Sequence, residues 1–312
     1  MSMSFNPQQD CFTFGCDYGV RVFNSNPPVL MRSLNRDLVG SVRLCTILHR
    51  SNLIVFVGAG TAAKFPSNVV FVWDDKRQDL ILEITVKGGP IINLLVEHTR
   101  LIVVQERKIH IFSFPSPCRL IRTEDIRPNP AGLVAMSGDK DCQMLVYPGF
   151  KIGSIQLMNL KTLTDSSSLA PNTIDAHLTE IVQLTINIDG TLVATGSLKG
   201  TVIRVFNTRT HGILMECRRG ADPSTLHCLQ FSPCSSYLAV SSDKGTIHVF
   251  AIRESDESSS RRSLLQQVGI IKERRSCAQI PVEQKVMSCG FIKGPHSQQS
   301  LIALCTDGSY HK

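Results

Sequence analysis

The chain of 312 residues has few aromatic side chains, 6% of the total, and a single tryptophan. Its longest apolar stretch, around residues 53–63, is too short to cross a bilayer. Residues 1–10 have neither the basic start nor the apolar centre of a signal peptide. We also find no His/Cys cluster with metal-ligand spacing, no Walker-type glycine loop and no GxSxG nucleophile. These absences predict a cytoplasmic protein that is not an enzyme and holds no metal or cofactor.

The sequence contains 11 cysteines, an odd number, and no Cys-x-x-Cys pair. Cys45, Cys228, Cys289 and Cys305 lie in apolar patterns typical of strands, which favours buried free thiols in a reducing compartment. The formal net charge of +7 favours an anionic partner. Basic residues are not interleaved with aromatic ones, as a nucleic-acid stacking surface requires, so we expect no nucleic-acid partner. We expect the chain to be a monomer.

Short apolar runs separated by turn residues dominate the chain, which predicts an all-β sandwich or propeller. An internal repeat decides between the two, because residues 192–206 and 238–250 are near copies of each other. Their glycines, Gly200 and Gly245, lie 45 residues apart, a spacing typical of propeller blades. Seven sets fit the chain, near residues 5–32, 40–86, 90–126, 130–165, 175–216, 222–280 and 285–312. We predict one seven-bladed β-propeller over residues 1–312, with an incomplete last blade as an open alternative.

One late segment breaks this repeat. Gly245 and Gly308 lie 63 residues apart, and the surplus falls at residues 253–279. The segment begins polar and then has an apolar centre between basic clusters, so we predict a long exposed loop within blade six. Two interpretations stay open. The loop is either a membrane-interface segment, whose Arg and Lys meet anionic headgroups, or an insertion whose apolar residues pack locally.

Two adjacent arginines, Arg218 and Arg219, lie between the two repeat copies and precede Gly220. If the copies are neighbouring blades, the pair lies on their connection and one guanidinium faces each blade. A guanidinium is a planar fork of donors that suits phosphate oxygens. The alternative is a solvated arginine pair beside ordinary turn residues. Because we place both arginines at the surface, we expect their replacement by alanine to change thermal stability little.

With the repeat, the Cys217-Arg218-Arg219-Gly220 junction and the long late loop, the chain resembles the WIPI/PROPPIN family of WD-repeat propellers. That family has seven blades, binds phosphoinositides and carries Phe/Leu-Arg-Arg-Gly between blades five and six. The resemblance covers nearly the whole chain. In this sequence Cys217 replaces the usual larger apolar residue.

The resemblance implies two phosphoinositide-binding pockets. The first comprises Arg218 with His177, Thr195, Ser197, Gly200, Thr201 and Arg204. The second comprises Arg219 and Gly220 with Ser242, Thr246 and His248. Hydroxyls and glycine N–H groups add neutral donors, and we expect the two histidines to contribute more as the pH falls. The residues expected to enter the membrane from the late loop are Leu264, Leu265, Ile270 and Ile271.

Two hypotheses about function remain. The resemblance implies a peripheral membrane effector that recognises phosphatidylinositol 3-phosphate and phosphatidylinositol 3,5-bisphosphate and recruits autophagy machinery during autophagosome formation. It also implies an autophagy lipid-transfer protein as partner and a place on preautophagosomal or endosomal membranes. The alternative is a protein-binding propeller scaffold whose arginines contact acidic peptides without lipid recognition.

Overall fold

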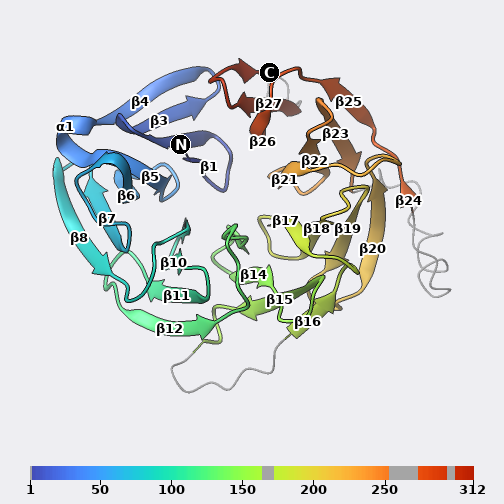
Figure 1. Cartoon of the computed structure of the whole chain (residues 1–312), viewed down its shortest axis with the longest axis horizontal. Helices are drawn as coiled ribbons and strands as arrows, with labels where there is room; N and C mark the ends of the chain where they lie inside the picture. Colours follow the sequence, from blue (N-terminus) through green and yellow to red (C-terminus); the bar gives the residue numbers. More distant parts are fainter. Residues whose placement is uncertain (1, 164–171, 253–272, 294–298) are drawn as a thin grey trace. The chain divides into compact units, whose positions relative to one another are not determined.

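The computed structural model describes residues 2–163, 172–252, 273–293 and 299–312. Its internal contacts divide the chain into two compact units. The first unit comprises Met1–Val134 with Asn159–Ala170, and the second comprises Ala135–Met158 with Pro171–Lys312. Figure 1 shows that each unit is built from sheets whose strands follow one another along the chain. In the described parts, no helix is long and apolar enough to span a membrane.

The first unit contains three four-stranded antiparallel sheets, each in chain order. The first sheet comprises β1 (Ser2–Phe5), β2 (Cys11–Cys16), β3 (Gly19–Ser25) and β4 (Pro28–Asn35). After the short helix α1 (Arg36–Val39), the second comprises β5 (Gly40–Ile47), β6 (Leu53–Ala63), β7 (Val69–Asp74) and β8 (Asp79–Thr85). The third comprises β9 (Asn93–Glu97), β10 (Arg100–Val104), β11 (Lys108–Ser113) and β12 (Leu120–Asp125).

The second unit contains four sheets. The first comprises β13 (Ala135–Met136), β14 (Met144–Pro148), β15 (Ser154–Asn159) and β16 (Asn172–Asp175). The next comprises β17 (Ile181–Ile186), β18 (Leu192–Ser197), β19 (Val202–Asn207) and β20 (Ile213–Arg218), with β24 (Glu273–Arg274) added at its edge. It is followed by β21 (Leu226–Phe231), β22 (Tyr237–Ser242) and β23 (Thr246–Ala251) with β25 (Ala278–Pro281). The last comprises β26 (Val286–Lys293), β27 (Gln299–Cys305) and β28 (Tyr310–His311).

The core is formed by apolar strand residues that pack between neighbouring sheets. In β6, Ile54 and Phe56 pack with the first sheet, whereas Val55 and Val57 pack with the third. Successive side chains of a strand point to opposite faces, so a strand covered on both faces reads as a continuous apolar run. Residues 54–58 of the longest apolar stretch in the sequence are therefore a buried part of β6.

The seven sheets match the seven predicted repeats, so the all-β class and the seven-bladed β-propeller prediction are confirmed. We refer to each sheet as a blade, numbered in the order of its first strand. The set predicted near residues 130–165 was too short, because blade four ends with β16. In the described part of blade seven there are three strands, which agrees with the incomplete alternative. All 11 cysteines are free thiols, and those buried are Cys11, Cys45, Cys217, Cys228, Cys289 and Cys305.

The loop predicted at residues 253–279 lies mostly outside the described residues, but its end is structured. β24 pairs in parallel with β20 of blade five, and β25 pairs with β23 of blade six. Strand residues therefore occur inside the range predicted as loop, because the edge strands β20 and β23 present unpaired backbone groups that a further segment can join. That the whole chain is one domain stays a prediction.

Candidate anion-binding site

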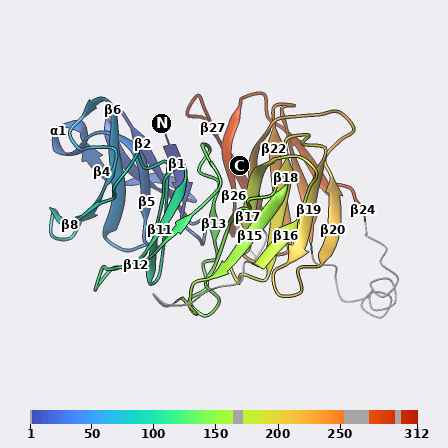
Figure 2. The same cartoon turned by 60° about the horizontal axis from the view of Figure 1, so that its bottom comes forward.

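The arginine pair lies on the connection between blades five and six. Arg218 is the last residue of β20, and Arg219 and Gly220 lead toward β21. Figure 2 shows β17–β20 side by side, with β24 beyond β20. Arg218 is exposed, whereas Arg219 is only 8% exposed. The two side chains therefore occupy different environments, as expected where consecutive residues of an extended chain point to opposite sides.

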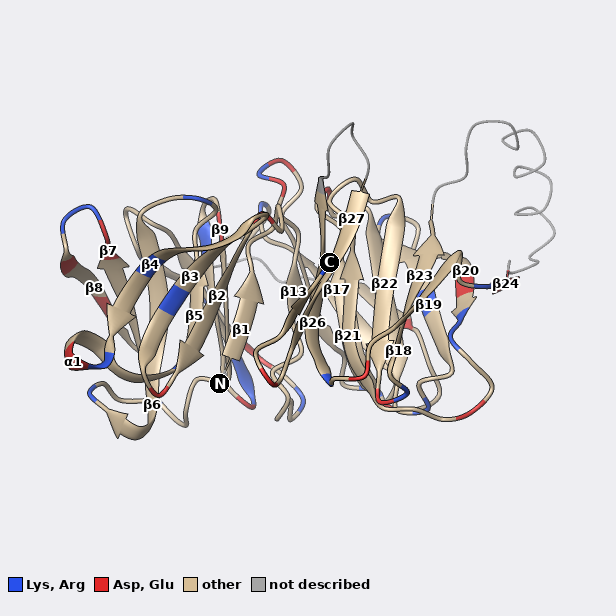
Figure 3. Cartoon of the chain, turned by 90° about the horizontal axis from the view of Figure 1, so that it is seen from above, with Lys and Arg blue, Asp and Glu red and all other residues tan. Residues whose placement is uncertain are grey.

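Arg218 pairs with a carboxylate that the sequence analysis missed. Its Nε donates to Oε1 of Glu273, a residue of β24, and the two groups form an ion pair. The hydrogen bond and the charge of Glu273 raise the pKa of Arg218, and the same contact lowers the pKa of Glu273. Figure 3 shows basic and acidic residues together at this edge. Both side chains are about half exposed, so water screens the pair and an anionic ligand can compete for Arg218.

Arg219 is buried and holds the connection through backbone carbonyls. Its Nε donates to the carbonyl oxygen of Gly200 at 2.8 Å, and its Nη2 donates to the carbonyl oxygen of Asp222. Its backbone N–H donates to the carbonyl oxygen of Thr201 at 2.9 Å. Burial lowers the pKa of Arg219 and outweighs the opposing charges of Asp243 and Asp222. The guanidinium is thus a buried cation whose hydrogen bonds go to neutral acceptors.

Three residues of the first predicted pocket form one cluster. Thr195, Arg204 and Glu216 lie opposite one another across β18, β19 and β20. Arg204 donates from Nε to Oε1 of Glu216 and from Nη1 to the carbonyl oxygen of Ala176, both at 2.7 Å. His177 follows Ala176, and its Nε2 lies 3.0 Å from Oγ1 of Thr195. The structure therefore brings His177, Thr195 and Arg204 together, with Glu216 as a fourth member that the sequence analysis missed.

The remaining residues of the first pocket form the turn between β18 and β19. The N–H of Gly200 donates to the carbonyl oxygen of Ser197 at 2.8 Å, and Thr201 follows as a buried residue. Gly200 has φ of 66°, and a Cβ there would lie 1.9 Å from the carbonyl oxygen of Ser224. Only glycine fits this position. Because Gly200 also accepts the bond from Arg219, this turn joins the first pocket to the second.

The second predicted pocket lies around the turn between β22 and β23. Ser242 ends β22, Thr246 begins β23, and His248 is two residues further along β23. Ser242 and His248 are buried, and Nδ1 of His248 lies 3.5 Å from Oγ of Ser276. After burial, the charge of Arg219 is the second cause that lowers the pKa of His248. Arg219 and His248 are therefore within electrostatic range of each other.

Comparisons with known proteins identify the family of the chain. The chain matches the family model described as PROPPIN over residues 2–265. The chain belongs to the PROPPIN family. It is 42% identical to Ectopic P granules protein 6 of Caenorhabditis elegans, over 94% of this chain and 76% of that protein. It is 34% identical to Autophagy-related protein 18 of Dictyostelium discoideum, over 83% of this chain and 66% of that protein. The solved structure of Kluyveromyces lactis Hsv2 is similar with a TM-score of 0.76 and 26% identity, covering 98% of this chain and 89% of that one.

In this PROPPIN, burial changes the role expected of the two histidines. Burial lowers the pKa of His177 to about 4, opposed by its hydrogen bond to Thr195 and assisted by the charge of Arg204. Burial also lowers the pKa of His248. With a pKa of about 4, the imidazole of His177 is neutral at neutral pH and stays neutral in mildly acidic solution. The expectation that both histidines bind anions better as the pH falls is therefore wrong for His177 above about pH 4.

Two further expectations for this PROPPIN are affected. Arg219 is buried and hydrogen-bonded, so the expectation that both arginines are exposed is wrong for Arg219. The residues expected to enter the membrane lie outside the described residues: Leu264, Leu265, Ile270 and Ile271. Their role stays a prediction.

The structure also reveals a candidate metal cluster where the sequence predicted none. Potential ligand atoms of His49, Glu97 and His98 lie within 4.8 Å of one another in the first unit. Spacing along the chain did not reveal it, because His49 is far in sequence from the other two.

Proposed function

We propose that this PROPPIN is a peripheral membrane effector that recognises phosphatidylinositol 3-phosphate and phosphatidylinositol 3,5-bisphosphate and recruits autophagy machinery. The observation that carries the proposal is that the two adjacent arginines lie in different environments. Arg218 is exposed and lies within electrostatic range of Glu216 in blade five, whereas Arg219 is buried and lies within electrostatic range of His248 in blade six. Two cations in such different environments suit two phosphate-binding sites better than one.

At the second site, the chemistry of Arg219 favours an anion. Two of its five N–H groups are committed to the carbonyl oxygens of Gly200 and Asp222, which fixes the plane of the guanidinium. Burial lowers the pKa of Arg219 despite the charges of Asp243 and Asp222, so the buried positive charge is only partly compensated. A phosphate group supplies the missing charge, and hydroxyl groups of Ser242 and Thr246 add neutral donors.

At the first site, carboxylates hold the arginines in place. Glu273 orients Arg218 and Glu216 orients Arg204. A phosphomonoester carries more negative charge than a carboxylate and accepts several hydrogen bonds. We therefore propose that the lipid phosphate displaces Glu273 from Arg218, since that pair is exposed and weak. Glu216 remains as the group that keeps Arg204 extended toward His177 and Thr195.

The cellular role rests on the relatives. One relative at 34% identity is named Autophagy-related protein 18. We propose for this chain an autophagy lipid-transfer protein as partner and a place on preautophagosomal or endosomal membranes. We also propose that the apolar centre of residues 253–279 enters the bilayer once the two sites have bound lipid. Apolar insertion and headgroup binding then act on the same membrane and reinforce each other.

The test is flotation of the protein with liposomes. Vesicles containing phosphatidylinositol 3-phosphate are compared with vesicles of equal charge that contain phosphatidylserine or phosphatidylinositol 4-phosphate. We expect the wild-type protein to float only with 3-phosphorylated lipid. The variant Arg218→Gln weakens flotation, whereas Arg209→Gln, which removes an exposed charge from the turn between β19 and β20, leaves it unchanged. Equal flotation on all anionic vesicles contradicts the proposal.

One observation favours the second candidate function, a protein-binding scaffold. Arg218 already binds a carboxylate of its own chain, Glu273, so the same guanidinium can hold an acidic side chain of a partner. An acidic peptide that binds the wild type but not Arg218→Gln, without flotation on any 3-phosphorylated lipid, selects the scaffold.

A further inference from the structure

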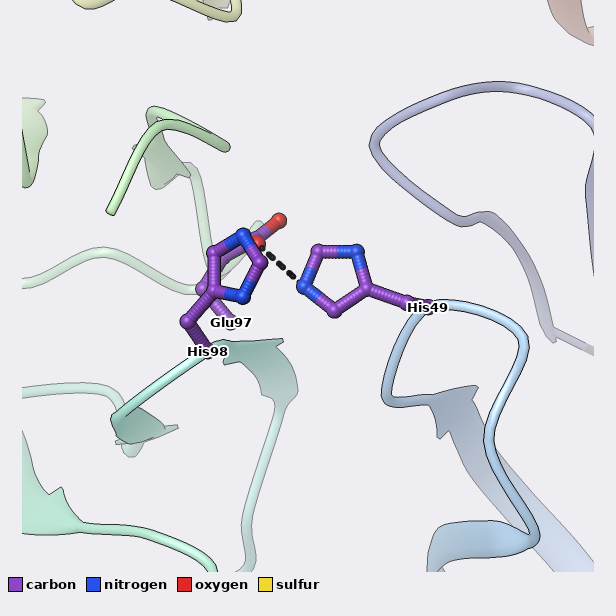
Figure 4. Close-up of side chains that lie close together, drawn as sticks. All are labelled: His49, Glu97 and His98. Carbon is purple, nitrogen blue, oxygen red and sulfur yellow. Dashed lines mark ion pairs between the residues drawn. The ribbon is translucent and has the colours of Figure 1, made fainter. Parts of the chain in front are cut away.

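Two turns of the first unit bring two histidines and a glutamate together. His49 lies in the turn between β5 and β6, Glu97 is the last residue of β9, and His98 begins the two-residue turn to β10. Figure 4 shows that the three side chains converge, His49 from one turn and Glu97 with His98 from the other. The two imidazole rings have centroids 4.0 Å apart. Two imidazoles and a carboxylate form a donor set that is typical of transition-metal sites.

The hydrogen bonds around His49 leave one ring nitrogen free. Nδ1 of His49 lies 3.0 Å from the amide oxygen of Gln8, in the turn between β1 and β2. An amide oxygen only accepts, so Nδ1 carries the proton and Nε2 presents its lone pair. The same amide oxygen accepts from Nδ2 of Asn6 at 3.5 Å, which supports its orientation.

The free nitrogen points at a second acceptor. Nε2 of His49 lies 3.4 Å from Oε2 of Glu97, and both atoms are buried without a hydrogen-bond partner in the described part of the chain. The Glu97 side chain is only 8% exposed. Two buried acceptors that face each other are costly unless a cation or a proton lies between them.

We propose that His49, Glu97 and His98 bind a zinc ion, with an open fourth position that takes water or a ligand from a partner. Zinc bonds to imidazole nitrogen and carboxylate oxygen are about 2.0–2.2 Å long, so neighbouring ligand atoms of a tetrahedron lie about 3.3–3.5 Å apart. Nε2 of His49 and Oε2 of Glu97 are already at 3.4 Å. Small side-chain movements bring the third ligand atom from within 4.8 Å to that distance. Magnesium and calcium prefer all-oxygen sites and do not fit this donor set.

Gln8 completes the site as a positioning residue. A metal-binding histidine commonly donates its other N–H to an acceptor that fixes the tautomer and the ring plane, and Gln8 provides that acceptor for His49. The bound ion therefore ties together the turns β1–β2, β5–β6 and β9–β10 of the first unit. His49 has φ of 50°, a turn conformation uncommon for residues other than glycine, which aims its ring at Glu97.

The experiment is a zinc titration of the full chain, freed of any histidine tag and treated with chelator, followed by calorimetry. The visible absorption of bound Co²⁺ reports four-coordinate geometry. We expect one Zn²⁺ per chain, and no binding of Mg²⁺ at the same concentration. His49→Asn, Glu97→Gln and His98→Asn each weaken zinc binding by at least about tenfold, as loss of a metal ligand or of its support does.

Matched variants separate this site from unspecific binding. His211→Asn is the control for His49→Asn, because His211 also lies in a tight turn with positive φ, 59°, and asparagine tolerates that conformation. Gln8→Ala weakens binding, and Gln8→Glu restores it because a carboxylate also accepts from Nδ1. Failure of the wild type to bind zinc overturns the proposal, as does unchanged binding in the double variant His49→Asn/Glu97→Gln. Circular dichroism of each variant excludes unfolding as the cause of a loss.

Discussion

The Nε of Arg219 donates a hydrogen bond to the carbonyl oxygen of Gly200 at 2.8 Å. This bond joins the start of the β20–β21 connection to the turn between β18 and β19, two segments that the sequence places in different predicted pockets. It fixes the buried guanidinium, and it makes the turn at Gly200 part of the environment of Arg219. Local stability and the proposed anion binding are therefore expected to be coupled at this position.

We first predict that the two arginines differ in their effect on stability. Arg219→Ala removes two charge-assisted bonds and leaves the carbonyl oxygens of Gly200 and Asp222 without these donors, so it lowers the free energy of unfolding by about 1.5–3 kcal/mol. Arg218→Ala removes an exposed ion pair and has little effect. Urea unfolding at neutral pH measures both. Equal stability of the two variants contradicts the assignment of Arg219 as buried.

The second prediction uses two equivalent glycines. Gly200 and Gly245 both have φ of 66°, but a Cβ on Gly200 meets the carbonyl oxygen of Ser224 at 1.9 Å, whereas one on Gly245 meets that of Val282 at 3.3 Å. Gly245→Ala therefore lowers the free energy of unfolding mainly through backbone strain, about 1–2 kcal/mol. Gly200→Ala adds a steric clash and is clearly more destabilising. Thermal unfolding of the pair gives the comparison, and similar melting temperatures speak against the close contact.

The third prediction concerns competition between Glu273 and a lipid phosphate. Glu273→Gln removes the negative charge that occupies Arg218, so flotation on vesicles with phosphatidylinositol 3-phosphate becomes stronger. Glu283→Gln, which removes an exposed negative charge from the same unit, is the control for net charge. If both variants strengthen flotation equally, the cause is long-range attraction between the more positive protein and the anionic membrane. In that case Glu273 does not compete with the lipid phosphate for Arg218.

The sequence predicted the blade number well because the repeat is local. Each blade is a meander, in which strands that are neighbours in the sheet are also neighbours in the sequence. A short stretch of sequence therefore contains a strand, a turn with glycine and the next strand. The equal φ of Gly200 and Gly245 shows that the near copies share one turn geometry. The position of the arginine pair between two copies followed directly.

Partners that come from distant parts of the chain were not predictable. Glu273 reaches Arg218 only because β24 joins the edge of β20 in parallel, and no pattern marks a two-residue strand. The sequence does not show which of the two adjacent arginines is buried. The burial of Arg219 depends on the positions of Gly200 and Asp222, whose carbonyl oxygens accept its hydrogen bonds. Glu97 and His98 meet His49 through the packing of two blades in the first unit, which spacing along the chain does not show.

The fourth prediction concerns pH and stability. Burial lowers the pKa of His177 from 6.5 to about 4, so between these values the unfolded chain binds more protons than the folded chain. The free energy of unfolding therefore falls as the pH falls through this range. From about pH 7 to about pH 5 the contribution of His177 falls by on the order of 2 kcal/mol. We expect His177→Gln to lose this part of the pH dependence, and His211→Gln to keep it, in urea unfolding at both pH values.

The last prediction concerns the two arginines as a pair on one membrane. In our proposal Arg218 and Arg219 belong to separate sites, so each single substitution leaves one site that still binds lipid. Two weak sites on one membrane reinforce each other through effective concentration, so the variant Arg218→Gln/Arg219→Lys should lose far more flotation than either single variant. Lysine at position 219 keeps the positive charge but not the planar fork that bonds Gly200 and Asp222.

The choice of lysine separates lost binding from lost folding. Arg219→Lys retains the charge, so it should unfold less readily than Arg219→Ala, and a melting curve on every variant shows which proteins are folded. A folded double variant that floats as well as either single variant means that the arginines share one site. A double variant that fails to float on a 3-phosphorylated membrane while it remains folded is the result that two sites require.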